Sequence, residues 1–341
     1  MTTLLVTGGC GFIGSEFIRQ QLATYPDQTL FNLDALTYAG NLDNLAEIAG
    51  HPNYTLVRGD VADADLVADL FSRHHFDLVV HFAAESHVDR SLQDSGPFVR
   101  TNIQGTQILL DAARRAAVTK YVQVSTDEVY GSLGPTGLFT EETPLAPNSP
   151  YSSSKAAADL LVRAYVHSFG FPAVITRCSN NYGPYQFPEK LIPLFVTNLF
   201  AGKQVPVYGS GLNVRDWIHV ADHCRGVDRA LRAGTPGEVY NFGGACEKTN
   251  LEITRLLIDL TGRDESAIRY VTDRAGHDHR YAIDFSKAHR DLGWQPQVPF
   301  ETGLAQTVDW YRTHPEWVDR IHSGAYRAPC HDDKDQVPTR S

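Results

Sequence analysis

Residues 7–14 read TGGCGFIG and lie between an apolar run at 3–7 and a helical pattern at 14–24. The glycines permit a tight turn and a close approach of the backbone, so the amides at the start of the helix can face a pyrophosphate. A plain strand-to-helix turn can carry the same pattern, but Asp34 follows at the end of the next apolar run. A carboxylate at that position binds a ribose 2′-hydroxyl and repels a 2′-phosphate. The two features together predict a site for NAD rather than NADP.

The rest of the first half alternates strand-like and helix-like patterns. Further strands are predicted at 29–33, 54–58, 78–82, 121–125 and 173–177, and further helices at 64–74, 99–117 and 151–169. Strands that alternate with helices predict an α/β fold with a doubly wound parallel Rossmann sheet, covered by helices on both faces. Ligands bind at the carboxyl ends of the strands in such sheets, so motifs that directly follow strands carry the most weight.

The pattern becomes less regular after about residue 184. Loops, short helices and Gly/Pro turns then dominate, which is typical of a smaller, mixed α/β domain. A strand-like run near 238–241 resembles the pattern of the first half. We therefore expect an NAD-binding domain at 1–184 that is rejoined by about 215–243, a substrate-binding domain at 185–330 and a polar tail at 331–341.

The composition narrows the class of partner and the compartment. The formal net charge of −10 argues against nucleic acid as the main partner, because binding needs phosphate-neutralising Lys and Arg. The five cysteines form no close pair, which predicts no metal site and fits a reducing cytoplasm. The N-terminus lacks the pattern of a signal peptide, and no stretch is long and apolar enough to cross a membrane. We expect a cytoplasmic protein with no membrane partner.

Tyr151 and Lys155 are four residues apart at the start of a predicted helix, which places them on one face. A lysine ammonium beside a phenol favours the phenolate, so we expect a lowered pKa for Tyr151. Such pairs are common by chance, but Ser125 ends an earlier predicted strand and the glycine-rich turn precedes both. Together these residues predict redox chemistry at a hydroxyl carbon. Asp60, after the third strand, fits an adenine contact and a helix cap about equally well.

In these residues the chain resembles the extended short-chain dehydrogenases/reductases and, among them, the dTDP-glucose 4,6-dehydratase family. The resemblance covers nearly the whole chain. Its motifs are LTYAGNL at 36–42, AAESHVDRS at 83–91, STDEVYG at 125–131, NNYGPYQ at 180–186, RDW at 215–217 and DRAGHD at 273–278. Small departures from the usual family residues stand at Cys10, Ser153 and His219, away from the expected chemistry.

The adjacent carboxyl groups Asp127 and Glu128 distinguish this family from the epimerases and decarboxylases that resemble it at the cofactor site. The resemblance implies that NAD accepts hydride from sugar C4 and returns it to C6, while Tyr151 takes the C4 hydroxyl proton. It implies Glu128 as the base at C5, Asp127 as the acid at the C6 hydroxyl and Thr126 as a hydrogen-bond partner of the C4 oxygen. Two carboxyl groups can divide this work if their environments separate their pKa values. The alternative for an Asp-Glu pair after a strand is an acidic helix-capping turn.

The resemblance also implies the remaining contacts. Those with tightly bound NAD, regenerated each turnover, are expected from Gly8, Gly11, Phe12, Ile13, Gly14, Asp34, Ala35, Leu36, Thr37, Gly40, Asp60, Val61, Phe82, Ala83, Ala84, Ser86, Thr101, Ser125, Tyr151, Lys155 and Asn181. Those with the nucleotide sugar are expected from Ser86, Thr126, Asn180, Lys190, Leu191, Pro206, Tyr208, Arg215, Asn250, Arg274 and His277. Among them, Arg215 and Arg274 are expected at the diphosphate, and Tyr208 is expected to stack on the pyrimidine.

Further expectations concern assembly and specificity. The resemblance implies a homodimer that forms a four-helix interface from 99–117 and 151–169. dTDP-glucose is the expected substrate, while a UDP-hexose or another NDP-hexose remains an alternative, because one methyl group distinguishes thymine from uracil. A 4-epimerase or decarboxylase would keep the fold and the NAD site. A regulator that binds NAD without catalysis would not need Thr126, Asp127, Glu128, Tyr151 and Lys155 together.

Overall fold

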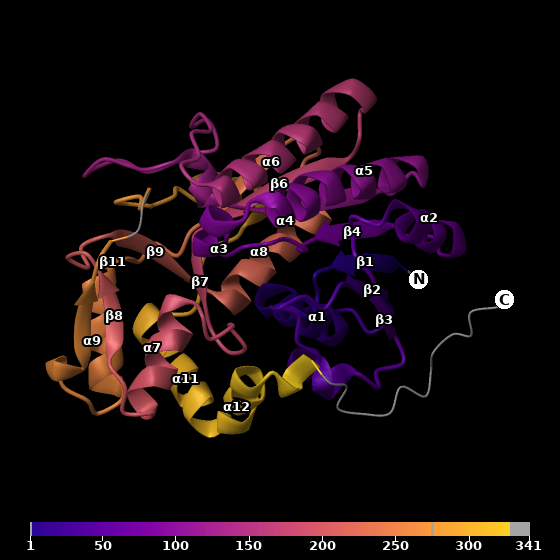
Figure 1. The fold of residues 1–341 in the computed structure, drawn as a ribbon. Helices are drawn as coiled ribbons and strands as arrows, with labels where there is room; N and C mark the ends of the chain where they lie inside the picture. Colours follow the sequence, from indigo (N-terminus) through magenta and orange to yellow (C-terminus); the bar gives the residue numbers. More distant parts are fainter. Residues whose placement is uncertain (1, 274–275, 328–341) are drawn as a thin grey trace.

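The computed structural model describes residues 2–273 and 276–327 and contains the predicted parallel sheet (Figure 1). Its strand order is β10-β6-β5-β4-β1-β2-β3, and the strand pairs are parallel throughout. The expectation of a doubly wound α/β fold is therefore confirmed. The strands are β1 (Thr3–Thr7), β2 (Thr29–Asp34), β3 (Tyr54–Arg58), β4 (Leu78–His81), β5 (Lys120–Thr126), β6 (Ala173–Cys178) and β10 (Val239–Phe242).

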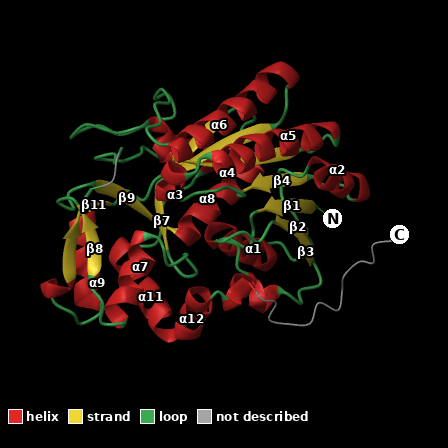
Figure 2. Ribbon diagram, in the orientation of Figure 1, coloured by secondary structure: helices red, strands yellow, loops and turns green. Residues whose placement is uncertain are grey.

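Helices cover both faces of this sheet, as Figures 1 and 2 show. Successive side chains of β1 point to opposite faces. Leu4 and Val6 pack in one apolar cluster with Phe17, whereas Leu5 packs in another cluster with Leu109. The helices of the first face are α1 (Phe12–Thr24) and α8 (Val220–Ala233), and those of the second are α2 (Ala64–Arg73), α5 (Thr106–Arg115) and α6 (Pro150–Phe169).

The C-terminal half adds smaller sheets and a separate apolar core. One sheet has the order β11-β9-β7 and another pairs β12 with β8. Their strands are β7 (Asn180–Tyr182), β8 (Val205–Tyr208), β9 (Val214–His219), β11 (Glu247–Thr249) and β12 (Ile268–Val271). The helices around them are α7 (Leu191–Phe200), α9 (Asn250–Leu260), α11 (Phe300–Thr313) and α12 (Pro315–Ser323). No helix in the described part of the chain is long and apolar enough to span a membrane.

The segment predicted as one helix at 99–117 differs from that prediction. It directly follows the short helix α4 (Gly96–Phe98), begins as the π-helix η2 (Val99–Gly105) and continues as α5, which ends at Arg115. Asn102 lies in the widened turn and is buried, and its side chain donates to the Glu85 carbonyl (3.0 Å) and to Ser154 Oγ (2.8 Å). These contacts with distant segments accompany the π-helical turn, so local periodicity does not reveal it.

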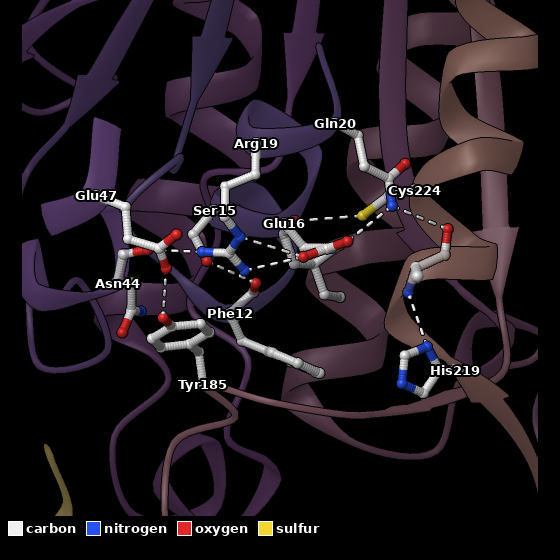
Figure 3. A network of polar contacts seen from close by, with 12 residues as sticks. Phe12, Ser15, Glu16, Arg19, Gln20, Asn44, Glu47, Tyr185, His219 and Cys224 are labelled. Carbon is white, nitrogen blue, oxygen red and sulfur yellow. Dashed lines mark hydrogen bonds and ion pairs between the residues drawn. The ribbon is translucent and has the colours of Figure 1, made fainter. Parts of the chain in front are cut away.

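A polar network joins α1 to the C-terminal half (Figure 3). Arg19 donates to the Asn44 carbonyl (2.7 Å) and pairs with Glu16 (2.9 Å), and its guanidinium carbon lies 4.5 Å from the centroid of the Tyr185 ring. The Tyr185 hydroxyl donates to Glu47 (3.0 Å). Tyr185 has a φ of 66°, an uncommon conformation for a residue with a side chain. The network therefore anchors a strained residue directly before a segment that enters the candidate site.

Candidate active site

A cavity lies at the carboxyl ends of strands β1 to β6, where ligands of parallel sheets bind. All the predicted NAD contacts line it except Leu36. The predicted catalytic residues Ser125, Thr126, Asp127, Glu128, Tyr151 and Lys155 line it too. Residues from six strand ends thus meet in one space, although they are spread over more than half of the chain.

The glycine-rich turn provides room for a pyrophosphate. Gly8 has a φ of +72°, and a Cβ there would lie 2.6 Å from the backbone of Ala83. A Cβ on Gly14 would lie 2.3 Å from the Gly8 carbonyl oxygen. Helix α1 begins after Gly11, which offers no side-chain cap to the first amides. These free helix amides and the close backbone approach fit the diphosphate of a dinucleotide.

Asp34 is held at the end of β2 by backbone amides. Its Oδ2 accepts from Cys10 N and its Oδ1 from Leu36 N, each at 2.8 Å. Burial raises the pKa of Asp34, and these hydrogen bonds oppose the rise. Each carboxylate oxygen can accept a further hydrogen bond, so the residue fits a ribose hydroxyl. Leu36 does not line the cavity, but its amide donates to Asp34, and its φ of 51° is uncommon for a residue with a side chain.

Asp60 has features of both predicted roles, an adenine contact and a cap. It lines the cavity, and its Oδ1 accepts from Ala62 N at 2.8 Å, as in a turn. Its Oδ2 lies 2.7 Å from Arg100 Nη2, with both side chains partly exposed. An adenine contact from Asp60 therefore remains a prediction.

Tyr151 and Lys155 are buried on one face of α6. Lys155 Nζ donates to the Val124 carbonyl at 2.7 Å. Burial raises the pKa of Tyr151 well above its ordinary value, with a further contribution from the charge of Glu128. The expected lowering of the Tyr151 pKa was wrong for this structure, because desolvation of the phenolate outweighs the opposing influence of Thr126.

The segment from Ser125 to Glu128 runs from the end of β5 into the 3-10 helix η3 (Asp127–Tyr130). Thr126 provides the cap, since its Oγ1 accepts from Glu128 N at 3.3 Å. Asp127 is only 2% exposed and lies in the cavity wall, unlike a solvated capping acid. Among the described residues, Ser125 Oγ and Asp127 Oδ2 are buried polar atoms without a hydrogen-bond partner. Buried polar atoms require partners, so both atoms fit contacts with a polar ligand.

The environment of Asp127 favours its protonated form. Burial raises its pKa well above the usual range, and the nearby charges of Glu128 and Asp216 raise it further. Arg215 opposes this effect, but desolvation is the largest cause. Asp127 is therefore suited to donate a proton.

The predicted sugar-nucleotide contacts fall into two groups. Ser86, Thr126, Asn180 and Lys190 line the cavity, and Lys190 Nζ donates to the Ser86 carbonyl at 2.9 Å. The residues Leu191, Pro206, Tyr208, Arg215, Asn250 and His277 lie outside its lining, and Arg274 lies outside the described residues. Roles for this second group remain predictions.

Two members of the second group have defined surroundings. Arg215 is buried, donates to backbone carbonyls including that of Asp278 (3.0 Å), and lies over the Tyr281 ring at 4.3 Å. Tyr208 is 38% exposed, and its ring lies edge-on to the His277 ring, with 6.3 Å between the two centroids. An exposed aromatic ring is available for stacking on a base.

Several residues of the cavity were not predicted from the sequence. Cys178 ends β6 and Ser179 follows it, so the rule that sites lie at the carboxyl ends of parallel strands could have identified them. Others come from the loop after β4 or from the segment after Tyr185, where no local pattern signals a site. They are Glu85, Gln186, Phe187 and Glu189.

Comparisons find similar proteins among nucleotide-sugar enzymes. Residues 5–307 match the family described as GDP-mannose 4,6 dehydratase. The chain is 55% identical over 319 residues to a dTDP-glucose 4,6-dehydratase of Actinoplanes sp., covering 92% of this chain and 99% of the relative. Among solved structures, the chain is similar to DesIV, a dTDP-glucose 4,6-dehydratase from Streptomyces venezuelae that was crystallised with NAD and TYD bound. The two proteins are 54% identical with a TM-score of 0.91, and the match covers 94% of this chain and 100% of DesIV. A UDP-glucose 4-epimerase from Thermotoga maritima, solved with UDP-glucose, is 29% identical with a TM-score of 0.85, covering 92% and 99%.

Proposed function

The chain belongs to the GDP-mannose 4,6-dehydratase family and, within it, to the dTDP-glucose 4,6-dehydratases, and we infer from this membership that it is an NAD-dependent hydro-lyase. It converts dTDP-glucose to dTDP-4-keto-6-deoxyglucose. The observation that carries the dehydration step is the pair Asp127–Glu128 at the cavity wall, with Asp127 held protonated by burial. The 4-epimerase and the decarboxylase need no such acid–base pair, so these alternatives are not favoured.

The residues divide the reaction between them. NAD, which Asp34 and the glycine-rich turn from Gly8 to Gly14 would hold, would supply the hydride acceptor for C4 and the hydride donor for C6. Tyr151 takes the C4 hydroxyl proton as a phenolate, a form that burial disfavours and that the Lys155 ammonium on the same helix face and the positive charge of bound NAD+ would favour. Glu128 removes the C5 proton, which the C4 ketone acidifies. Asp127 donates its proton to the departing C6 hydroxyl, so that water leaves.

Two features of the cavity support retention of NAD through this cycle. The loop after β2 lines the cavity through Thr37, Ala39 and Gly40. Between these residues, Tyr38 lies under the Arg90 guanidinium at 3.7 Å, and its carbonyl accepts from the Tyr326 hydroxyl at 2.6 Å. These contacts fix the loop at the edge of the cofactor site, as a cofactor regenerated on the enzyme requires.

We further propose a division of the chain into an NAD-binding unit at 1–184 with 215–243 and a nucleotide-sugar-binding unit at 185–330.

We also propose a homodimer that forms through 99–117 and 151–169. Exposed apolar side chains on these segments support the interface, since Val99 is 53% and Leu160 54% exposed. A cytoplasmic location is supported by the free thiols of the four described cysteines, Cys10, Cys178, Cys224 and Cys246.

Parallel incubation with dTDP-, UDP-, CDP- and GDP-sugars tests the reaction and the nucleotide together. Formation of a 4-keto-6-deoxy product from dTDP-glucose, faster than from the other sugars, is the expected result. A galactose epimer as product would instead establish the epimerase. Unchanged substrates with NAD bound would establish a regulator and overturn the proposed function. Preference among nucleotides is measured as the ratio of kcat/KM values.

A further inference from the structure

The chain changes sheets beside the catalytic residues. Strand β6 ends at Cys178 in the large sheet, and β7 begins at Asn180 in the small one, so Ser179 alone forms the crossover. All three residues line the cavity. The position of this crossover therefore determines where the cavity wall lies near Asn180, the residue that is expected to contact the sugar.

His223 lies beneath the crossover on helix α8, which packs against both β6 and β7. Its side chain is 0% exposed. Its Nδ1 lies 3.0 Å from Oδ1 of Asn181, the second residue of β7. His223 does not line the cavity, so it can act on the site only through another residue.

The chemistry of the neighbours fixes the orientation of the Asn181 amide. Its Nδ2 lies 3.0 Å from the Ser179 carbonyl oxygen and 3.3 Å from Cys178 Sγ. A carbonyl oxygen can only accept, so the NH2 group must face Ser179 and the amide oxygen must face His223. The backbone carbonyl of Asn181 also accepts from Gln186 Nε2 at 2.9 Å. Asn181 thus contacts Ser179 through its side chain and Gln186, a second residue of the cavity wall, through its backbone.

This orientation determines the tautomer of His223. Burial lowers the pKa of His223 to about 3, so the imidazole is neutral and carries one proton. Because Asn181 Oδ1 accepts, that proton is on Nδ1. Nε2 is then a bare acceptor, and among the described residues it has no hydrogen-bond partner. The Nδ1 hydrogen bond is therefore the single polar contact that the imidazole makes within the described chain.

We propose that His223 is a positioning residue for the dehydratase reaction: its Nδ1–H locks the Asn181 amide, which holds the Ser179 crossover and so places Asn180 toward the sugar. This inference rests on the proposed function. A shift of about 1 Å in a site of this kind can lower the rate by roughly 100-fold.

Substitutions at His223 separate the hydrogen bond from simple packing. In His223→Asn the amide nitrogen is bonded to Cγ, as Nδ1 is, so the donor stays in place. His223→Leu has a similar branched shape without a donor, and Val227→Ala removes core volume one turn further along α8, where Val227 is fully buried. We expect kcat/KM for dTDP-glucose to fall about 10- to 100-fold in His223→Leu and less than about 3-fold in His223→Asn and in Val227→Ala.

Several outcomes would overturn the proposal. Equal losses in His223→Asn and His223→Leu would show that the donor is irrelevant. A loss in Val227→Ala that matches His223→Leu at the same fall in Tm would attribute the effect to stability. If His223→Leu does not fold, the comparison of His223→Asn with His223→Gln replaces it, because glutamine places its donor one bond further out and is expected to lose at least 10-fold relative to His223→Asn.

A spectroscopic measurement on the native protein is independent of activity. The imidazole 15N shifts of His223 are expected to show protonation at Nδ1, and protonation at Nε2 would refute the contact. Inactivity of the native chain toward dTDP-glucose would remove the proposed function, while the 15N measurement would still decide the tautomer. Failure of the two proposals can therefore be distinguished.

Discussion

Replacing Asp127 by asparagine is expected to separate the proton of this side chain from its shape. The two side chains are nearly the same size, and both can accept the contact from Thr126 Oγ1, now 3.3 Å from Asp127 Oδ1. Asparagine cannot donate a proton to a departing hydroxyl. We therefore expect C4 oxidation to persist while water elimination slows by roughly 10²- to 10⁴-fold, the usual contribution of a general acid.

The same variant is expected to be more stable than the native protein at neutral pH. Because burial raises the folded pKa of Asp127, the folded chain keeps a proton that the unfolded chain releases above about pH 4. The contribution of Asp127 to the free energy of unfolding is thus fully present below the pKa of this residue in the unfolded chain. It is lost as the pH rises through the pKa in the folded chain. Over that range the native free energy of unfolding falls, relative to the variant, by about 1.4 kcal/mol per pH unit.

Two assays test this reasoning. Denaturant unfolding of both proteins between about pH 5 and 8 gives the difference in stability, and single-turnover measurements follow NADH formation and loss of the C6 hydroxyl separately. The exposed residue Asp259 offers a control, since Asp259→Asn removes a carboxylate from the surface. A stability difference that does not change with pH would refute the protonated state of Asp127. Unimpaired elimination in Asp127→Asn would exclude it as the acid.

Three further substitutions test other parts of the site. Glu128→Gln is expected to permit C4 oxidation but to block exchange of the C5 hydrogen with solvent, and full deuterium incorporation at C5 would exclude Glu128 as the base. Tyr151→Phe is expected to impair the first hydride transfer, measured as NADH formation, so near-normal turnover would contradict its role. Arg177→Met leaves the buried carboxylate of Asp159 without its partner at 2.9 Å, and is expected to cost about 3–5 kcal/mol of unfolding free energy in denaturant. A loss below about 1 kcal/mol would contradict the importance of this buried ion pair for stability.

The order of elements in the large sheet was predictable because each strand is a short apolar run between turn residues. Strands β1 and β3 have the predicted bounds, and the other predicted strands differ by a residue or two at their ends. The predicted run at 238–241 is β10, at Val239–Phe242, which pairs with β6. The π-helical turn at Val99–Gly105 was not predictable, because its buried Asn102 is fixed by partners from other segments.

The candidate site was predictable where its residues directly follow strands or the glycine-rich turn. The segment Gln186–Lys190 reaches the cavity by a different route, from a loop anchored through Tyr185 on α1 and η1 (Leu42–Ile48). No periodicity accompanies such a loop. Residues there can be located only after the two halves of the chain are packed together.

By itself the sequence determined the cofactor turn, the carboxylate Asp34 and the set from Ser125 to Glu128 with Tyr151 and Lys155, because these motifs depend on local order along the chain. Only the tertiary structure decided the direction in which the pKa values of Asp127 and Tyr151 shift, since desolvation depends on which distant groups cover a side chain. It also decided the contact between His223 and Asn181, which are 42 residues apart. Local sequence specifies which groups can react, whereas packing sets their protonation and their positions.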